Sequence, residues 1–199
     1  MKVSKEQMAE NRAHILDTAA TLFRERGFDG IGVADLMKGA GFTHGGFYGH
    51  FASKEDLMAQ ASSHALAKGL AYWESLAGKV KDDPIATLEA HYLSKQHRDH
   101  PGAGCLLAAL GADAARQDGP VRRAVTEGVR SMVGLLEGLL PGRSKAARRQ
   151  KALATYASLV GALVLARAVD DPALSEEILL ATKASLGVPP PAGKPAKSA

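Results

Sequence analysis

Apolar residues recur roughly every three to four positions along most of this chain, as they do on one face of an α-helix. In the first segment, Ile15, Ala19, Leu22 and Phe23 form one such stripe. The sequence lacks runs of alternating β-branched residues, which would indicate half-buried strands. The pattern therefore predicts an all-α protein.

Caps and helix-breaking residues divide the chain into about nine predicted helices. Ser4 and Gln7 have the spacing of a capping box, Gly27 ends the first helix, and Pro120 falls in the first turn of a later one. Residues 188–199 are rich in proline, alanine and lysine, which predicts a disordered tail. The predicted helices span roughly 4–27, 33–40, 43–50, 53–77, 84–96, 104–117, 120–140, 145–169 and 172–186.

Two short predicted helices, over 33–40 and 43–50, are joined by a glycine and lie between longer amphipathic segments. This is the layout of a helix-turn-helix. Gly41 supplies the turn, and Phe47 and Phe51, spaced i, i+4, would hold the second helix on the core. That helix is rich in glycine, which lets its backbone approach another surface closely, as docking in a DNA major groove requires.

The segments GAGFTHGGFYGHFASKEDL and RAHILDTAATLFRERGFDGIGV resemble the signature of TetR-type transcriptional regulators. The joint spacing A-G-x-T-x-x-x-F-Y-x-H-F-x-S-K-E carries the resemblance, which covers residues 10–57. It implies a DNA-binding domain over 8–68 and a helical ligand-binding and dimerisation domain over 69–187. The implied function is that of a homodimeric repressor, without a cofactor, which binds a palindromic operator in double-stranded DNA until a small-molecule inducer releases it.

The resemblance also implies which residues contact the DNA backbone. Thr43 would cap the second short helix and touch a phosphate, and Tyr48 and His50 would hydrogen-bond phosphates. Lys54 would add a charged phosphate contact at the start of the next helix. The family usually has Thr or Ser where this chain has Gly32, so a hydroxyl contact is lost there and only the backbone N–H remains.

Base edges would be faced by His44, Gly45 and Gly46, again by resemblance. Other interpretations of these positions stay open. Tyr48 is alternatively a partly buried core residue, His50 a helix cap, and the glycines a loop without a partner.

The helices predicted over 145–169 and 172–186 are candidates for dimerisation, because each has a face of small or apolar residues suited to close packing. Burial of these faces within one subunit is the alternative. The predicted interface residues are Ala154, Ala157, Ser158, Gly161, Leu165, Ala168, Leu174 and Ile178.

A ligand pocket is expected among the central helices, since apolar walls with a few polar groups are typical of such sites. Each candidate is alternatively an ordinary core or surface residue. The candidates are Tyr72, Trp73, His91, Tyr92, Cys105, Leu106, Leu110, Met132 and Leu136.

Cys105 is the only cysteine, which excludes an internal disulfide and fits a reducing cytoplasm. It falls in the first turn of a predicted helix, where the helix amino terminus favours the thiolate. We therefore consider a second hypothesis, in which oxidants or electrophiles modify Cys105 and release the DNA, against the alternative of a small buried hydrophobe. A metal site with His97, Asp99, His100 and Cys105 is disfavoured, because Pro101 follows His100 and ends the helix there.

Composition changes this picture little. A net charge of +4 is too small to indicate a nucleic-acid partner by itself, and residues 1–60 carry seven basic against eight acidic residues. DNA binding would thus depend on a few placed donors. The polar amino end and the short apolar stretch 152–166 predict a cytoplasmic protein without a membrane partner. A ligand-independent DNA-binding factor and a small helical enzyme are the competing functions, and we find no catalytic constellation for the enzyme.

Overall fold

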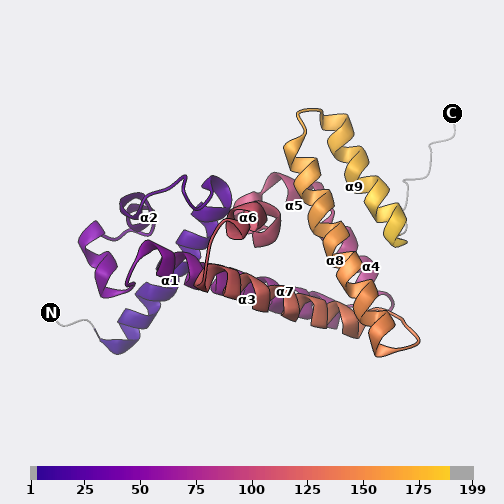
Figure 1. Cartoon of the computed structure of the whole chain (residues 1–199), viewed down its shortest axis with the longest axis horizontal. Coiled ribbons are helices and arrows are strands. Elements are labelled where there is room, and N and C mark those ends of the chain that lie inside the picture. The colour runs from indigo at the N-terminus through magenta and orange to yellow at the C-terminus, as the bar shows by residue number, and fades with distance from the viewer. Residues whose placement is uncertain (1–3, 189–199) are drawn as a thin grey trace. The chain divides into compact units, whose positions relative to one another are not determined.

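The computed structural model describes residues 4–188, and within that range all regular structure is helical (Figure 1). The predicted all-α class is confirmed. In chain order the helices are α1 (Lys5–Arg26), α2 (Val33–Gly39), the 3-10 helix η1 (His44–Gly49), α3 (Lys54–Lys79), α4 (Pro84–Tyr92), α5 (Lys95–Asp99), the 3-10 helix η2 (Pro101–Ala103), α6 (Leu106–Ala115), α7 (Pro120–Leu139), α8 (Lys145–Ala168) and α9 (Pro172–Leu186).

Capping hydrogen bonds and the backbone preferences of single residues set the ends of the helices. The Ser4 hydroxyl accepts a hydrogen bond from the backbone N–H of Gln7 at 3.1 Å, as the predicted capping box requires. Gly27 ends α1 with a φ of 78°, in the region that favours glycine. Asp171 caps α9 by accepting from the N–H groups of the two residues after Pro172.

Two predicted helices differ from the structure for identifiable reasons. The glycine-rich second short helix is a 3-10 helix instead of an α-helix, because glycine is a poor former of α-helices. The helix predicted over 84–96 stops at Tyr92, and a new helix starts at Lys95, because the Ser94 hydroxyl accepts from the His97 N–H at 3.1 Å.

The described chain forms two compact units that are not contiguous in sequence. The first contains the chain up to Tyr72 and residues 100–132, and the second contains residues 73–99 and the chain from Val133. The sequence predicted contiguous domains, 8–68 and 69–187. That division by function stays a prediction; in the compact units, α6 and the start of α7 share a core with α1, which no local pattern reveals.

The first unit has an apolar core around α1, α2, η1, α3, α6 and the start of α7. Polar bonds join α1 to the segment that follows residue 100. The Arg24 Nε donates to the Gly102 carbonyl at 2.8 Å, and the Phe28 N–H donates to the Asp113 carboxylate at 3.4 Å. These bonds attach η2 and α6 to the carboxyl-terminal end of α1.

In the second unit, α8 and α9 lie side by side (Figure 1). Ser175, which is buried, donates to the Ala166 carbonyl at 2.6 Å and accepts from Arg98 at 3.1 Å. The Arg167 Nε donates to the Arg98 carbonyl at 3.0 Å. Together these bonds tie α5, α8 and α9 to one another.

α8 is the one helix in the described chain that is long and apolar enough to cross a membrane by length and composition alone. One of its faces, which includes Ala152, Tyr156, Leu159 and Leu163, is buried in the second unit.

The end of α9 corrects the predicted start of the tail. Gly187 adopts a left-handed conformation, and the Val188 N–H donates to the Lys183 carbonyl at 3.0 Å. Val188 is buried, so it belongs to the helix end and not to a disordered tail. The rest of that prediction, residues 189–199, lies outside the described residues.

Candidate nucleic-acid interface

The turn between α2 and η1 is fixed by backbone geometry. Gly41 has a φ of 77°, which only glycine adopts without strain. The next residue, Phe42, donates its N–H to the Met37 carbonyl at 2.8 Å, so α2 ends in a hydrogen-bonded turn. The chain therefore leaves α2 in a set direction and begins η1 two residues later.

η1 has one buried side and one exposed side. Phe47 is 1% exposed and packs against Phe51, with 5.7 Å between the ring centroids. Its neighbour Tyr48 is 68% exposed, and its ring meets the edge of Phe47 at 5.2 Å. The interpretation of Tyr48 as a core tyrosine is therefore wrong.

The predicted DNA contacts form a mostly exposed set around η1. Thr43 occupies the N-cap position, but its side chain makes no capping hydrogen bond, so its predicted capping role is wrong. His50 follows η1 and is half-buried, and Lys54 begins α3 and is also half-buried. The remaining members, all exposed, are Gly32, His44, Gly45, Gly46 and Tyr48.

Gly32 is the N-cap of α2, and no side chain caps that helix. Its φ of −88° is accessible to any residue, and a Cβ added there would meet nothing within 4 Å. The position can thus accept the hydroxyl residue that the sequence pattern predicts. Glycine is not required by the fold here.

Arg12 of α1 positions the end of η1, and the sequence analysis did not single it out. Its Nη1 donates to the His50 carbonyl, and its Nη2 donates to the Gln60 side chain on α3. The guanidinium also lies 4.6 Å from the centroid of the Phe51 ring, a cation–π contact. The sequence contained one signal, since Arg12 is the first residue of the RAHILD segment.

The amino end of α3 is capped reciprocally. The Asp56 N–H donates to the Ser53 hydroxyl at 3.1 Å, and the Asp56 carboxylate accepts from the Ala52 N–H at 3.1 Å. The side-chain amide of Gln60 also donates to Asp56, and together these donors lower the pKa of that carboxyl group. This cap fixes the place of Lys54 at a helix amino terminus, where an anion is favoured.

Comparison with known proteins decides the family. Residues 15–61 match the family described as bacterial regulatory proteins, tetR family. The HTH-type transcriptional repressor NemR of Escherichia coli K12 is 30% identical over 142 residues, which cover 69% of this chain and 71% of NemR. The chain belongs to the TetR family. Like its relatives, this TetR-family protein is a DNA-binding transcriptional regulator and not an enzyme.

Other members agree with this assignment. The regulator AcrR of Shigella flexneri is 39% identical over 92 residues, 46% of this chain and 35% of AcrR. The crystal structure of reduced E. coli NemR has a TM-score of 0.75 and 26% identity, and the match covers 89% of this chain and 96% of NemR. A TetR-family regulator from Cytophaga hutchinsonii has the same fold, with a TM-score of 0.75, 19% identity, and coverage of 94% and 97%.

The predicted ligand-pocket residues are distributed over both units, and their joint role in a pocket stays a prediction. Trp73, His91 and Tyr92 lie together in the second unit, where the Trp73 ring is 5.6 Å from His91 and 5.8 Å from Tyr92. Leu106 and Leu110 belong to the core of the first unit. The others are the exposed Tyr72, the half-buried Cys105, and the buried Met132 and Leu136.

Cys105 is the N-cap residue of α6 and not part of its first turn, so the predicted position is wrong by one residue. The thiol interacts electrostatically with the half-buried guanidinium of Arg24. Among residues 4–188, no group of three or more His, Cys, Asp or Glu side chains is arranged to hold a metal ion.

The predicted dimerisation face is accessible in the protomer. Leu165 is 56% exposed and Leu174 is 42% exposed, so burial of this face within one subunit is excluded. The sequence analysis missed three further exposed apolar residues on the same two helices, namely Leu153, Val164 and Leu180. The remaining predicted residues are the exposed Ala154, Ala157, Ser158 and Ala168 and the half-buried Gly161 and Ile178.

Proposed function

We propose that the protein is a cytoplasmic, homodimeric repressor that binds a palindromic operator through η1 and is released by a small-molecule inducer. The observation that carries the proposal is the opposite exposure of consecutive residues on η1. Phe47 holds the helix on the core, while Tyr48 and His44 face outward. A short helix with an apolar inner side and an exposed side of glycines, hydroxyls and imidazole fits a major groove.

In this proposal the phosphate contacts come from Thr43, Tyr48, His50 and Lys54, together with the backbone N–H of Gly32. The base contacts come from His44 and the adjacent backbone of Gly45 and Gly46. Because residues 1–60 carry slightly more acidic than basic residues, affinity depends on these placed donors and not on a general positive field. The salt dependence of binding is accordingly that of a few phosphate contacts per subunit.

Dimerisation is proposed through the exposed face of α8 and α9. Several large apolar side chains in one accessible area mark an association surface. A second copy is the natural occupant, because a helix-turn-helix dimer must hold its two reading helices about 34–36 Å apart to engage successive major grooves. Leu165, with 56% of its surface exposed, has the most exposed large side chain on this face.

The link between α1 and η2 offers a route from an inducer to the DNA. Arg24 donates two hydrogen bonds to the Gly102 carbonyl, and a Cβ at Gly102 would lie 2.4 Å from the Glu25 carboxylate. η2 therefore cannot shift without moving the end of α1. A ligand that prefers a shifted α6 and η2 would change the position of η1 through the shared core.

Thiol modification is a second candidate for the releasing signal. Cys105 directly follows η2 and Gly104, is partly accessible, and interacts with the Arg24 cation. Addition of a bulky or polar group at Cys105 would disturb the packing of η2 on α1.

The test combines gel shifts with oligomeric-state measurements. The wild-type protein is expected to sediment as a dimer and to bind DNA flanking its own coding region. Leu165→Glu is expected to be monomeric and to lose specific binding, whereas Met8→Glu, at a position that is also half exposed, stays dimeric.

A Cys105→Ser protein that is still released by peroxide or quinone would eliminate the thiol as the sensor. Failure to bind any palindrome would refute the proposal.

A further inference from the structure

Glu89 is an unusual side chain in the core of the second unit. It lies on α4 and is only 3% exposed. Within residues 4–188 its carboxyl group has no hydrogen-bond donor, and neither of the charged groups that act on it, Asp83 and Lys151, forms an ion pair with it. Burial removes most of the water around this carboxylate, and no hydrogen bond from the described chain replaces it.

The side chain is consequently held close to neutrality. Burial, reinforced by the negative charge of Asp83 and only partly opposed by Lys151, raises the pKa of Glu89 to about 7. A buried leucine or methionine would fill the same volume without this penalty. We therefore expect this carboxyl group to interact with a molecule that is not part of the chain.

Aromatic side chains lie about one helical turn from Glu89. Tyr92 lies one turn further along α4, on the same face as Glu89, and is 2% exposed. The Trp73 ring lies 5.8 Å from that of Tyr92 at an interplanar angle of 31°, and the edge of His91 meets Trp73 at 5.6 Å. Faces of Trp and Tyr attract cations, and apolar walls with one convergent polar group are the usual lining of a small-molecule site.

We infer that Glu89 is the residue that recognises the inducer, and that the inducer is a small organic cation with an aromatic body. Its ammonium N–H groups donate to the Glu89 carboxylate, while the aromatic body packs on Trp73 and Tyr92. This inference rests on the proposed function and specifies its ligand class. A cation supplies a hydrogen-bond donor and a positive charge in contact with the Glu89 carboxylate, and the described chain provides neither. An anion is repelled by the ionised carboxylate.

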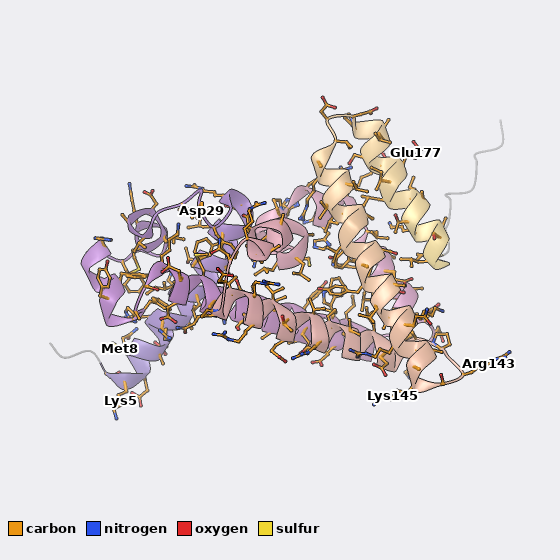
Figure 2. All side chains as sticks on the ribbon, viewed as in Figure 1. Lys5, Met8, Asp29, Arg143, Lys145 and Glu177 are labelled. Carbon is orange, nitrogen blue, oxygen red and sulfur yellow. The ribbon has the colours of Figure 1, made fainter. Side chains whose placement is uncertain are left out.

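Trp73 is the only tryptophan in the sequence, so the tryptophan fluorescence of the protein reports on this site. Tryptophan fluorescence of the full-length dimer is titrated at pH 8, where Glu89 is mostly ionised. The probes are two matched series: benzylamine, benzyl alcohol and benzoate, and 4-phenylbutylamine, 4-phenylbutan-1-ol and 4-phenylbutyrate. The control variant is Glu177→Gln, which removes the same charge from an exposed position on α9 (Figure 2).

In the wild type we expect at least one amine to bind tenfold or more tightly than its alcohol, and the matching acid to bind worst. Glu89→Gln is expected to abolish that preference while leaving alcohol binding unchanged, and Glu177→Gln is expected to keep it. Glu89→Met serves as a second variant of similar volume. Equal binding of amine and alcohol by the wild type, absence of binding by both amines, or a preference that survives in Glu89→Gln would overturn the inference.

Gel shifts on the same samples separate this inference from the proposed function. Glu89→Gln should still bind operator DNA with wild-type affinity but should no longer be released by the amine. A protein that binds DNA specifically and shows no amine preference would refute the role of Glu89 and leave the repressor assignment standing. A protein that binds no DNA would refute the repressor assignment, whatever the amines do.

Discussion

Phe47 and Tyr48 follow one another on η1, and replacing each of them separates the stability of the helix from its contact with DNA. Phe47 is 1% exposed within the core of the first unit, and Tyr48 is 68% exposed. Phe47→Ala is therefore expected to weaken the fold. Tyr48→Phe is expected to weaken only DNA binding.

The structure sets the size of each effect. Phe47→Ala removes a buried ring that packs on Phe51 and Tyr48, and such truncations lower the free energy of unfolding by about 3–5 kcal/mol. Tyr48→Phe keeps the ring contact and removes only an exposed hydroxyl, so stability should change by less than about 0.5 kcal/mol. Loss of one hydrogen bond to a phosphate costs about 1.5 kcal/mol, or roughly tenfold in affinity.

Urea denaturation followed by circular dichroism measures the first effect, and fluorescence anisotropy with labelled operator and unrelated DNA measures the second. Tyr72→Phe is the matched control, because Tyr72 is 48% exposed and lies outside η1. Tyr48→Phe should weaken binding to both DNAs by a similar factor. A Tyr48→Phe protein destabilised by more than about 1 kcal/mol, or one with unchanged affinity for both DNAs, would refute the assignment of Tyr48 to the phosphate-contacting surface.

Three further predictions concern backbone geometry, capping and proton linkage. Gly30→Ala should lower the melting temperature markedly, because its Cβ would lie 1.9 Å from the Arg26 carbonyl oxygen; a neutral change would contradict the packing of that loop. Gly32→Ser should raise the free energy of unfolding by up to about 1 kcal/mol through a new N-cap and should tighten operator binding, and denaturation and anisotropy measure both. Burial lowers the pKa of His97 to about 4, so below an unfolded pKa of about 6.5 the unfolded chain binds a proton that the folded chain does not. The contribution of His97 to the free energy of unfolding is thus complete above about pH 6.5 and is lost as the pH falls toward 4. Between pH 7 and pH 5, denaturation should show a smaller change in the free energy of unfolding for His97→Gln than for the wild type. Equal changes in the two proteins would refute this linkage.

Local chemistry made much of the fold predictable. The caps at Ser4 and Asp171, the glycine at position 27 and the proline at position 120 act within one helical turn, so the sequence displays them directly. The exposed face of α8 was also readable, because its small residues recur with the helical period. These features need no knowledge of distant contacts.

Features that depend on tertiary contacts were not predictable. The attachment of η2 to α1 depends on bonds between Arg24 and Gly102, which are 78 positions apart, and that of α6 on the bond between Phe28 and Asp113, which are 85 positions apart. The role of Arg12 depends on contacts with His50 and on the ring of Phe51. Glu89 resembles any polar residue of an amphipathic helix, and only the packed structure reveals that it is buried without a partner.

The central claim is that two copies of this chain read DNA through η1, and selection of binding sites from a random duplex library tests it most directly. The account predicts enrichment of a two-fold symmetric sequence whose half-site centres are separated by about one helical turn of DNA or a multiple of it. His44→Ala should change the base preference within each half-site, while Tyr48→Phe should not. Enrichment of no sequence, or of an asymmetric one, would contradict the account.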